Sequence, residues 1–256
     1  MTTTFQYISD LHLECYNDKV NKVKRKFNLK NKASDILLLA GDIGKPTHNT
    51  YKEFLKEMSI TFEQVIITTG NHEYYNMNMN IDDVDIICRD ICRSMPHNNV
   101  KFLQNEVYEI NNTLTIFGGT FWTKIPLSSR DLISYSVNDY KHISDFTPEK
   151  SSILHGIAIN ALKTALEQSD VNTKWIVMSH HMPSFDLIDA KYKTLQMNKL
   201  NYAFASDIPL THDDRIKAWV YGHTHTPKQI NKFYCNPVGY PGENKIFDLT
   251  KSFQIS

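Results

Sequence analysis

Seven residues with metal-binding side chains are spread along the 256-residue chain, and each lies at the end of a short apolar run. They are Asp10, His12, Asp42, Asn71, His180, His223 and His225. Two carboxylates, one amide oxygen and four imidazoles form a mixed nitrogen and oxygen donor set, which suits Mn, Fe, Zn or Co. One tetrahedral zinc needs only four ligands. Seven ligands therefore predict two divalent transition metal ions. Of the four candidate metals, we favour Mn.

The spacing of four of these residues indicates how they could reach a cation. Asp10 and His12 are separated by one residue, and so are His223 and His225. Residues i and i+2 of a strand project to the same face, so we expect each pair to reach one ion from a single strand end. Asp42 can bridge two ions, and Gly222 permits a close approach of the backbone.

The elements that must position these residues are short apolar runs. They cover residues 5–12, 35–42, 65–72, 114–122, 175–181 and 218–225. Such continuous runs are typical of strands that are buried on both faces of a sheet. Apolar spacing predicts a helix over 152–168 and weaker helices over 51–63 and 81–95. Residues 100–118 are predicted to form a strand pair that turns at Asn111-Asn112.

Alternating strands and helices predict an α/β layered fold, in which ligands gather at the carboxyl ends of the strands. We expect a single domain over residues 1–256, with cap insertions at about 123–150 and 184–214, because long insertions often form lids. Residues 14–34 are rich in lysine. They form either a solvated surface segment or a loop that steers phosphate.

The composition is that of a soluble globular protein without a strong charge preference. Lys plus Arg and Asp plus Glu each number 28, so the formal net charge is zero. This balance does not favour nucleic acid or an anionic membrane as partner. The sequence shows neither a signal peptide nor a membrane-spanning run, and its four cysteines form no disulfide-like framework. We expect a cytoplasmic protein; the oligomeric state is left open.

The ordered motifs identify a family. Asp10-x-His12, Gly41-Asp42, Gly70-Asn71-His72-Glu73, His180 and Gly222-His223-x-His225 resemble the calcineurin-like metallophosphoesterase superfamily. The resemblance implies a four-layer αββα sandwich with a dinuclear metal centre at the carboxyl ends of the strands. Within it, the stretch GGTFWT, the tract at 138–140 and the tail at 236–243 resemble small bacterial and phage phosphoesterases. Val238 stands where that group has an Arg.

The resemblance also implies a role for each motif residue. Asp10, His12 and His225 would bind the first metal, Asn71, His180 and His223 the second, and Asp42 would bridge them. The segment at 179–183 offers both His180 and His181, and the strand register favours His180. His72 and Asp42 are the expected catalytic residues. His72 would protonate the leaving oxygen or contact the phosphate, and Glu73 would orient His72 or a loop, or lie at the surface.

These features predict a metal-dependent phosphodiesterase or phosphatase acting on small molecules, by in-line attack of a hydroxide held by both metals. Nucleotides and cyclic nucleotides are candidate substrates, because cap aromatics could stack a base; otherwise these aromatics pack the cap. They are Tyr135, Tyr140, Tyr192 and Tyr202. One alternative is a nuclease, which would need a basic groove. The other is a catalytically inactive docking scaffold, which would be expected to lack part of the metal set.

Overall fold

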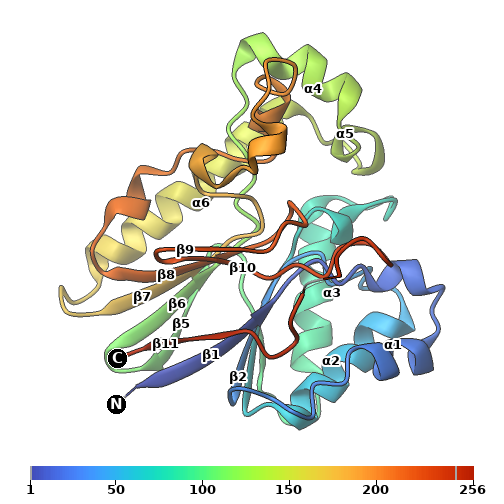
Figure 1. The fold of residues 1–256 in the computed structure, drawn as a ribbon, viewed down its shortest axis with the longest axis vertical. Helices are drawn as coiled ribbons and strands as arrows, with labels where there is room; N and C mark the ends of the chain where they lie inside the picture. The colour runs from blue at the N-terminus through green and yellow to red at the C-terminus, as the bar shows by residue number, and fades with distance from the viewer. Residues whose placement is uncertain (1, 246) are drawn as a thin grey trace.

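Two β-sheets pack face to face in the computed structural model, which describes residues 2–245 and 247–256 (Figure 1). The first sheet has the order β11 (Ser252–Ile255), β1 (Thr3–Ile8), β2 (Ile36–Ala40), β3 (Gln64–Thr68), β4 (Val100–Phe102). The second has the order β5 (Glu106–Asn111), β6 (Leu114–Gly118), β7 (Lys174–Met178), β8 (Ile216–Tyr221), β10 (Phe233–Cys235), β9 (Lys228–Ile230). The N- and C-terminal ends lie close together (Figure 1).

Parallel pairing dominates the interior of both sheets. Strands β1 to β4 are parallel to one another, as are β6, β7, β8 and β10, and the antiparallel strands β11, β5 and β9 lie at the edges. Parallel strands bring their carboxyl ends to one edge of a sheet. The loops that carry the predicted ligands therefore leave each sheet at a common edge.

The prediction of one strand pair over residues 100–118 is wrong in part. Strands β5 and β6 do form an antiparallel hairpin. Residues 100–102, however, pair with β3 in the other sheet, where Val100 lies beside Val65 and Phe102 beside Ile67. The chain changes sheets after β4, and Asn105 adopts a left-handed conformation with φ 57° in this connection. Apolar alternation alone does not reveal such a change of sheet.

Strand side chains alternate between two apolar layers. Leu38 and Ile66 lie in the layer between the sheets, together with Ile176 and Met178 from the second sheet. The intervening side chains of the first sheet, such as Leu39, face the helices instead. Both faces of the central strands are therefore buried, which confirms the interpretation of the apolar runs.

Helices cover both outer faces of the sheet pair and complete four layers (Figure 1). Helices α1 (Val20–Lys26), α2 (Asn49–Thr61) and α3 (Ile81–Arg93) lie on the first sheet, and α6 (Pro148–Gln168) lies on the second. Helix α6 begins four residues before the predicted start, because Thr147 caps it and accepts a hydrogen bond from the Lys150 amide. Pro at the first helical position and a Thr cap together favour this start. The predicted α/β sandwich is confirmed.

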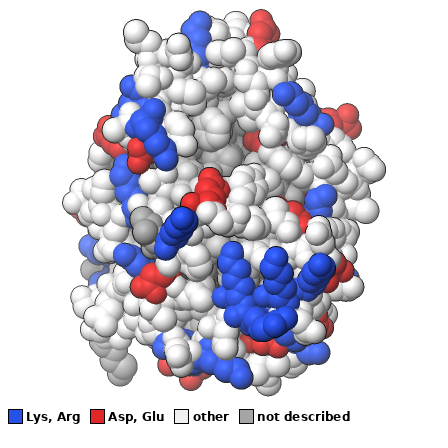
Figure 2. All heavy atoms as spheres, turned by 45° about the vertical axis from the view of Figure 1, so that its right-hand side comes forward, with Lys and Arg blue, Asp and Glu red and all other residues white. Residues whose placement is uncertain are grey.

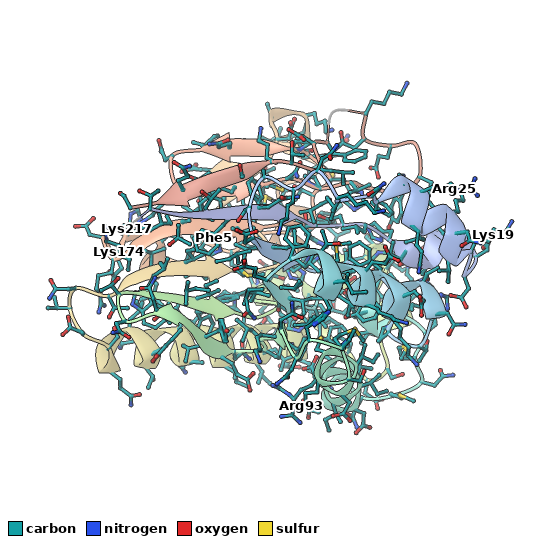
Figure 3. The ribbon with its side chains drawn as sticks, turned by 90° about the horizontal axis from the view of Figure 1, so that it is seen from below. Phe5, Lys19, Arg25, Arg93, Lys174 and Lys217 are labelled. Carbon is teal, nitrogen blue, oxygen red and sulfur yellow. The ribbon has the colours of Figure 1, made fainter. Side chains whose placement is uncertain are left out.

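The lysine-rich stretch 14–34 contains α1 and packs through one face only. Val23, Phe27 and Leu29 are buried in the same apolar cluster as α2. The charged side chains point outward, as Lys19 and Arg25 show (Figure 3). Lys24 forms ion pairs with two glutamates of α2. This stretch is therefore a packed surface element.

Above the sheets, two segments distant in sequence lie side by side (Figure 1). The first contains α4 (Arg130–Ser136) and α5 (Asp139–His142), and the second is a series of short 3-10 helices between Phe185 and His212. Ile125, Ile133 and Ala203 form a small apolar cluster that joins them. Below, "the cap" means residues 127–142 and 184–212. Among the described helices, none has the length and apolar character required to cross a membrane.

Candidate metal centre

The predicted ligands lie in loops that follow β1, β2, β3, β7 and β8, and most of these loop residues have left-handed backbones. The φ angles are 55° at Asp10, 48° at His12, 53° at Asp42, 73° at His223 and 48° at His225. Non-glycine residues adopt such angles rarely and at a cost. The donor atoms of Asp10 and His12 do fall in one group at the end of β1, as expected, whereas those of His223 and His225 fall in two different groups. Turned backbones aim these side chains.

A first group of donor atoms gathers around His12. Its Nε2 lies 2.9 Å from Nε2 of His225, and the latter lies 3.5 Å from Oδ1 of Asp10. With a carboxylate oxygen of Asp42, these atoms all lie within 4.8 Å of one another. Two imidazole nitrogens facing each other at this distance suit coordination of one cation.

A second group shares Asp42 with the first. Its Oδ2 lies 3.3 Å from Nε2 of His180 and 3.8 Å from Nε2 of His12. Nε2 of His180 also lies 3.1 Å from Oδ1 of Asn71. Nε2 of His223 is buried and has no hydrogen-bond partner in the described part of the chain. Burial lowers the pKa of His223, so this nitrogen carries a free lone pair suited to a metal.

The Nδ1 atoms of three of these histidines face hydrogen-bond acceptors outside the two donor groups. Nδ1 of His12 faces Oε1 of Glu14 at 3.0 Å, Nδ1 of His180 faces the Ala40 carbonyl at 2.9 Å, and Nδ1 of His225 faces Oε2 of Glu243 at 2.6 Å. Each acceptor keeps the proton on Nδ1 and directs the Nε2 lone pair inward. This arrangement is typical of metal-binding histidines. The residues present therefore fit a pair of cations.

His181 points away from this centre. Its Nδ1 faces the Thr120 carbonyl at 3.2 Å, and its ring packs against Trp122. Burial and the neighbouring His180 lower the pKa of His181 to about 3. The geometry thus favours His180 as the ligand from this segment.

His72 lies beside the donor atoms and has a carboxylate partner. Its backbone amide donates to Oδ1 of Asp42 at 2.8 Å, its Nδ1 lies 3.1 Å from Glu14, and its Nε2 lies 3.1 Å from the Tyr240 hydroxyl. Burial opposes the charge of His72, but Asp42 and Glu14 outweigh it and raise its pKa to about 9. Burial likewise opposes the charge of Glu14, but hydrogen bonds from His12 and His72 lower its pKa to about 2. The two carboxylates therefore favour the protonated form of His72.

Asn71 is held by the cap. Its Nδ2 donates to Oδ1 of Asp139 at 2.7 Å, and the Tyr75 hydroxyl donates to the same oxygen at 2.5 Å. Asp139 is buried at the start of α5. With the amide NH2 engaged, Oδ1 of Asn71 is turned toward His180. The cap thus orients a predicted metal ligand.

Glu73 is buried and organises two of the loops. Its carboxylate accepts hydrogen bonds from the backbone amides of Ile43 and Gly70, both at 2.8 Å, and from Asp42 at 3.2 Å. Of the three possibilities raised by the sequence, the structure shows the loop-orienting one. The carboxylate joins the loop after β2 to the loop after β3.

Two glycines allow the loops to meet. A Cβ at Gly70 would lie 2.2 Å from Oδ1 of Asp42, and a Cβ at Gly222 would lie 2.7 Å from Oδ2 of Asp10. Neither contact is tolerable for a real side chain. The close backbone approach expected at Gly222 is confirmed.

Five residues of the site had no role assigned from the sequence. They are Glu14, Tyr75, Asp139, Tyr240 and Glu243. Asp139 belongs to the tract at 138–140, and Tyr240 and Glu243 belong to the tail at 236–243, so the family resemblance contained a signal for these three. Val238, from the same tail, is buried in the core and does not take the place of a phosphate-binding Arg.

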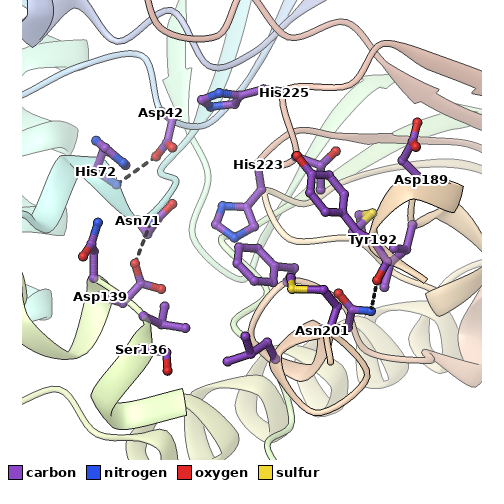
Figure 4. A pocket seen from close by; sticks show the side chains of 18 of the residues that line it. Asp42, Asn71, His72, Ser136, Asp139, Asp189, Tyr192, Asn201, His223 and His225 are labelled. Atoms are coloured by element: carbon purple, nitrogen blue, oxygen red, sulfur yellow. Dashed lines mark hydrogen bonds between the residues drawn. The ribbon is translucent and has the colours of Figure 1, made fainter. Parts of the chain in front are cut away.

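A cavity of about 380 Å3 opens over the donor atoms (Figure 4). Its floor includes Asp42, Asn71 and His72, and its walls come from both cap segments. Among the four aromatics proposed to stack a base, only Tyr192 lines it. Tyr135 is exposed. Tyr140 stacks on Phe146, and Tyr202 packs edge-on against Phe185.

The family comparison agrees with this geometry. A model of the calcineurin-like phosphoesterases matches residues 4–227. The chain therefore belongs to the calcineurin-like phosphoesterase family, and it is a hydrolase acting on phosphoesters.

Individual relatives extend the comparison over nearly the whole chain. An uncharacterised protein of Acanthamoeba polyphaga mimivirus is 32% identical over 271 aligned positions, covering 95% of this chain and 93% of that protein. The phosphopantetheinyl hydrolase of Mycobacterium tuberculosis has a similar structure, with a TM-score of 0.68 at 20% identity over 93% of this chain and 90% of that one. A protein of Thermus thermophilus matches at a TM-score of 0.55 and 11% identity, over 93% and 90%. At these identities the two solved structures show a shared fold.

Loss of the buried Glu73 carboxylate should destabilise the protein. Glu73→Ala leaves four backbone amides without this acceptor, and each unsatisfied buried donor costs about 1–3 kcal/mol. We expect the free energy of unfolding, measured by urea denaturation followed by circular dichroism, to fall by about 3 kcal/mol or more. Glu63→Ala, at an exposed position before β3, is the control and should change it by less than about 0.5 kcal/mol. Equal stabilities of the two variants would contradict the role given to Glu73.

Proposed function

We propose that this protein is a two-metal hydrolase of small-molecule phosphoesters, in which seven side chains hold the ions and His72 donates a proton. The observation that carries the proposal is the position of Asp42, whose Oδ2 lies between His12 and His180. One carboxylate is thereby shared by two groups of donor atoms. We expect Mn at these positions, and a cytoplasmic location remains a prediction of the sequence.

The chain's own residues would act as follows. The first ion would be held by Asp10, His12 and His225, and the second by Asn71, His180 and His223, with Asp42 between them. When bound, such ions lower the pKa of water and neutralise charge on phosphoryl oxygens. The cavity wall restricts the substrate to a position above these side chains.

His72 is the proposed general acid. In its imidazolium form, Nδ1 donates to Glu14 and Nε2 donates to the Tyr240 hydroxyl. Since His72 lines the cavity, its Nε2 proton is available to a leaving oxygen placed there. Positive charge near Asp42 would bring the raised pKa of His72 down toward neutrality, where general acids work best.

The distribution of Lys and Arg allows the nuclease alternative to be compared with the structure. A nucleic-acid strand is held by rows of Lys and Arg along an open groove. No Lys or Arg lines the cavity described here. In the view of Figure 2 the largest group of Lys and Arg lies below the hollow, on the side of the molecule where α1 lies, and a few others stand beside the hollow. These observations support a small substrate, and retention of a labelled single strand in a gel would argue for a nuclease.

Asp42→Asn tests the shared carboxylate. We expect hydrolysis of bis-p-nitrophenyl phosphate to fall at least about 100-fold, because the substitution removes the charge common to both ions. Mass spectrometry of the purified protein should show fewer than two metal ions per chain. The control is Asp145→Asn, at an exposed position outside the cap with the same left-handed backbone. Full metal content and full activity in Asp42→Asn would refute the proposed bridge.

His72→Ala tests the general acid through the leaving group. Loss of a general acid costs about 100-fold to 10,000-fold when the leaving group needs protonation, and less when it is a stable anion. We therefore expect His72→Ala to slow a diester with an alkyl alcohol leaving group far more than one with p-nitrophenol. The ratio of the two kcat/KM values is the measurement. An equal loss for both substrates would assign His72 to phosphate contact alone.

Asp139→Ala tests the support of Asn71 by the cap. Residues that orient a metal ligand contribute about 10-fold to 100-fold to metal affinity. We expect one of two Mn binding events in a calorimetric titration to weaken by about 10-fold, while the other is unchanged. Asp145→Asn is again the matched control. Two unchanged binding events would show that Asp139 does not position Asn71.

A further inference from the structure

The cavity above the donor atoms has two chemically different ends (Figure 4). The metal-binding end carries Asp42, Asn71, His223 and His225, beside His72. The cap end is apolar, with side chains from both cap segments and from the loop after β7. They are Val137, Met182, Ile188, Met197, Leu200 and Phe204. An apolar wall with a few polar groups is typical of sites that enclose an organic group.

The apolar wall begins next to the donor atoms. The ring of Phe204 stacks on the ring of His223 with centroids 5.2 Å apart and an interplanar angle of 30°. A phosphate bound by ions at Asp42 and His223 would therefore place the first atoms of its ester group against Phe204. Met197 and Leu200, on the same segment, continue the wall away from the ions.

Charge in the cavity is one-sided. Among the described residues, the lining includes no Lys or Arg, while besides Asp42 it includes Asp139, Asp189 and Glu243. These carboxylates already have partners. Asp139 accepts from Asn71 and Tyr75, Asp189 accepts from the Lys191 amide, and Glu243 faces His225. A second anionic group placed at the cap end, away from His72 and the metal ligands, would lose its water and meet no counter-charge there.

The polar groups at the cap end are neutral. Ser136, Asn138, Tyr192 and Asn201 lie along this part of the lining. Nδ2 of Asn201 donates to the Tyr192 carbonyl at 3.0 Å, which ties two turns of the cap together. Such groups accommodate an isolated hydroxyl or amide and supply no full charge.

We infer that the cap cavity binds a neutral, largely apolar ester group of the substrate, and that it discriminates against esters carrying a second anionic group. This inference rests on the proposed function, because the phosphate must lie at the metal centre. It excludes nucleoside polyphosphates and phosphorylated acids as preferred substrates. Met197, Leu200 and Val137 are the proposed specificity-determining residues.

The test uses three phosphonates that contain no ester bond and cannot be hydrolysed: methylphosphonate, hexylphosphonate and 5-carboxypentylphosphonate. Binding to the Mn-loaded protein is measured by calorimetry and by inhibition of bis-p-nitrophenyl phosphate hydrolysis. Each buried methylene favours binding by about fourfold, so we expect the hexyl compound to bind at least about tenfold more tightly than the methyl compound. The carboxypentyl compound should bind no better than the methyl compound.

Met197→Lys should reverse this order. A cation in the wall should remove most of the hexyl preference and strengthen carboxypentyl binding at least about fivefold, because the carboxylate then has a partner. Leu195→Lys is the matched control: it adds the same charge two residues away at a position that is 92% exposed and outside the lining. It should leave all three affinities unchanged. Val137→Lys repeats the test from the other cap segment if Met197→Lys fails to fold.

The outcomes separate the inference from the proposed function. Hydrolysis of bis-p-nitrophenyl phosphate with equal affinities for the three phosphonates would overturn the inference and leave the hydrolase intact. A carboxypentyl compound that binds more tightly than the hexyl compound in the unaltered protein would overturn it as well. Absence of diester hydrolysis by the metal-loaded protein would instead count against the proposed function.

Discussion

The site depends on one carboxylate being reached from both sheets. Asp42 follows a strand of the first sheet, as does His12, whereas His180 follows a strand of the second. Oδ2 of Asp42 lies 3.3 Å from His180 and 3.8 Å from His12. The apolar layer between the sheets sets these distances, because it fixes how closely the two sets of strand ends approach each other. A tightly packed interior resists such displacement, so the core between the sheets is also the frame of the metal centre.

Around this carboxylate, the loops hold conformations that short loops would not adopt alone. Left-handed residues at five of the predicted ligands carry a backbone cost, which must be offset by other interactions. Part of the compensation is visible in the buried Glu73 carboxylate, which binds amides of both the β2 and β3 loops. Further support comes from Asp10, which accepts a hydrogen bond from the His223 amide at 2.9 Å. The donor atoms are thus arranged before any substrate arrives, as two-metal chemistry requires.

The cap and the two-sheet sandwich contribute different residues to the cavity. The sandwich supplies the predicted metal ligands, and the cap supplies most of the apolar side chains that line the cavity. Asp139 and Asp189 are acidic cap residues of the lining, and Asp139 reaches from α5 to Asn71 and to Tyr75. The cap therefore supports a predicted metal ligand as well as lining the cavity. A change in its position would alter both.

The sequence by itself determined the layered fold, the strand ends as the place of chemistry, and the family. These features follow from local patterns, since buried parallel strands need apolar runs and catalytic groups follow them. The tertiary structure alone decided which nitrogen of each histidine is free, that His180 faces Asp42, and that residues 100–102 join the first sheet. It also revealed Glu14 and Asp139, whose partners His72 and Asn71 lie 58 and 68 positions away. Contacts across such separations depend on how the sheets and the cap pack, and no local pattern records that packing.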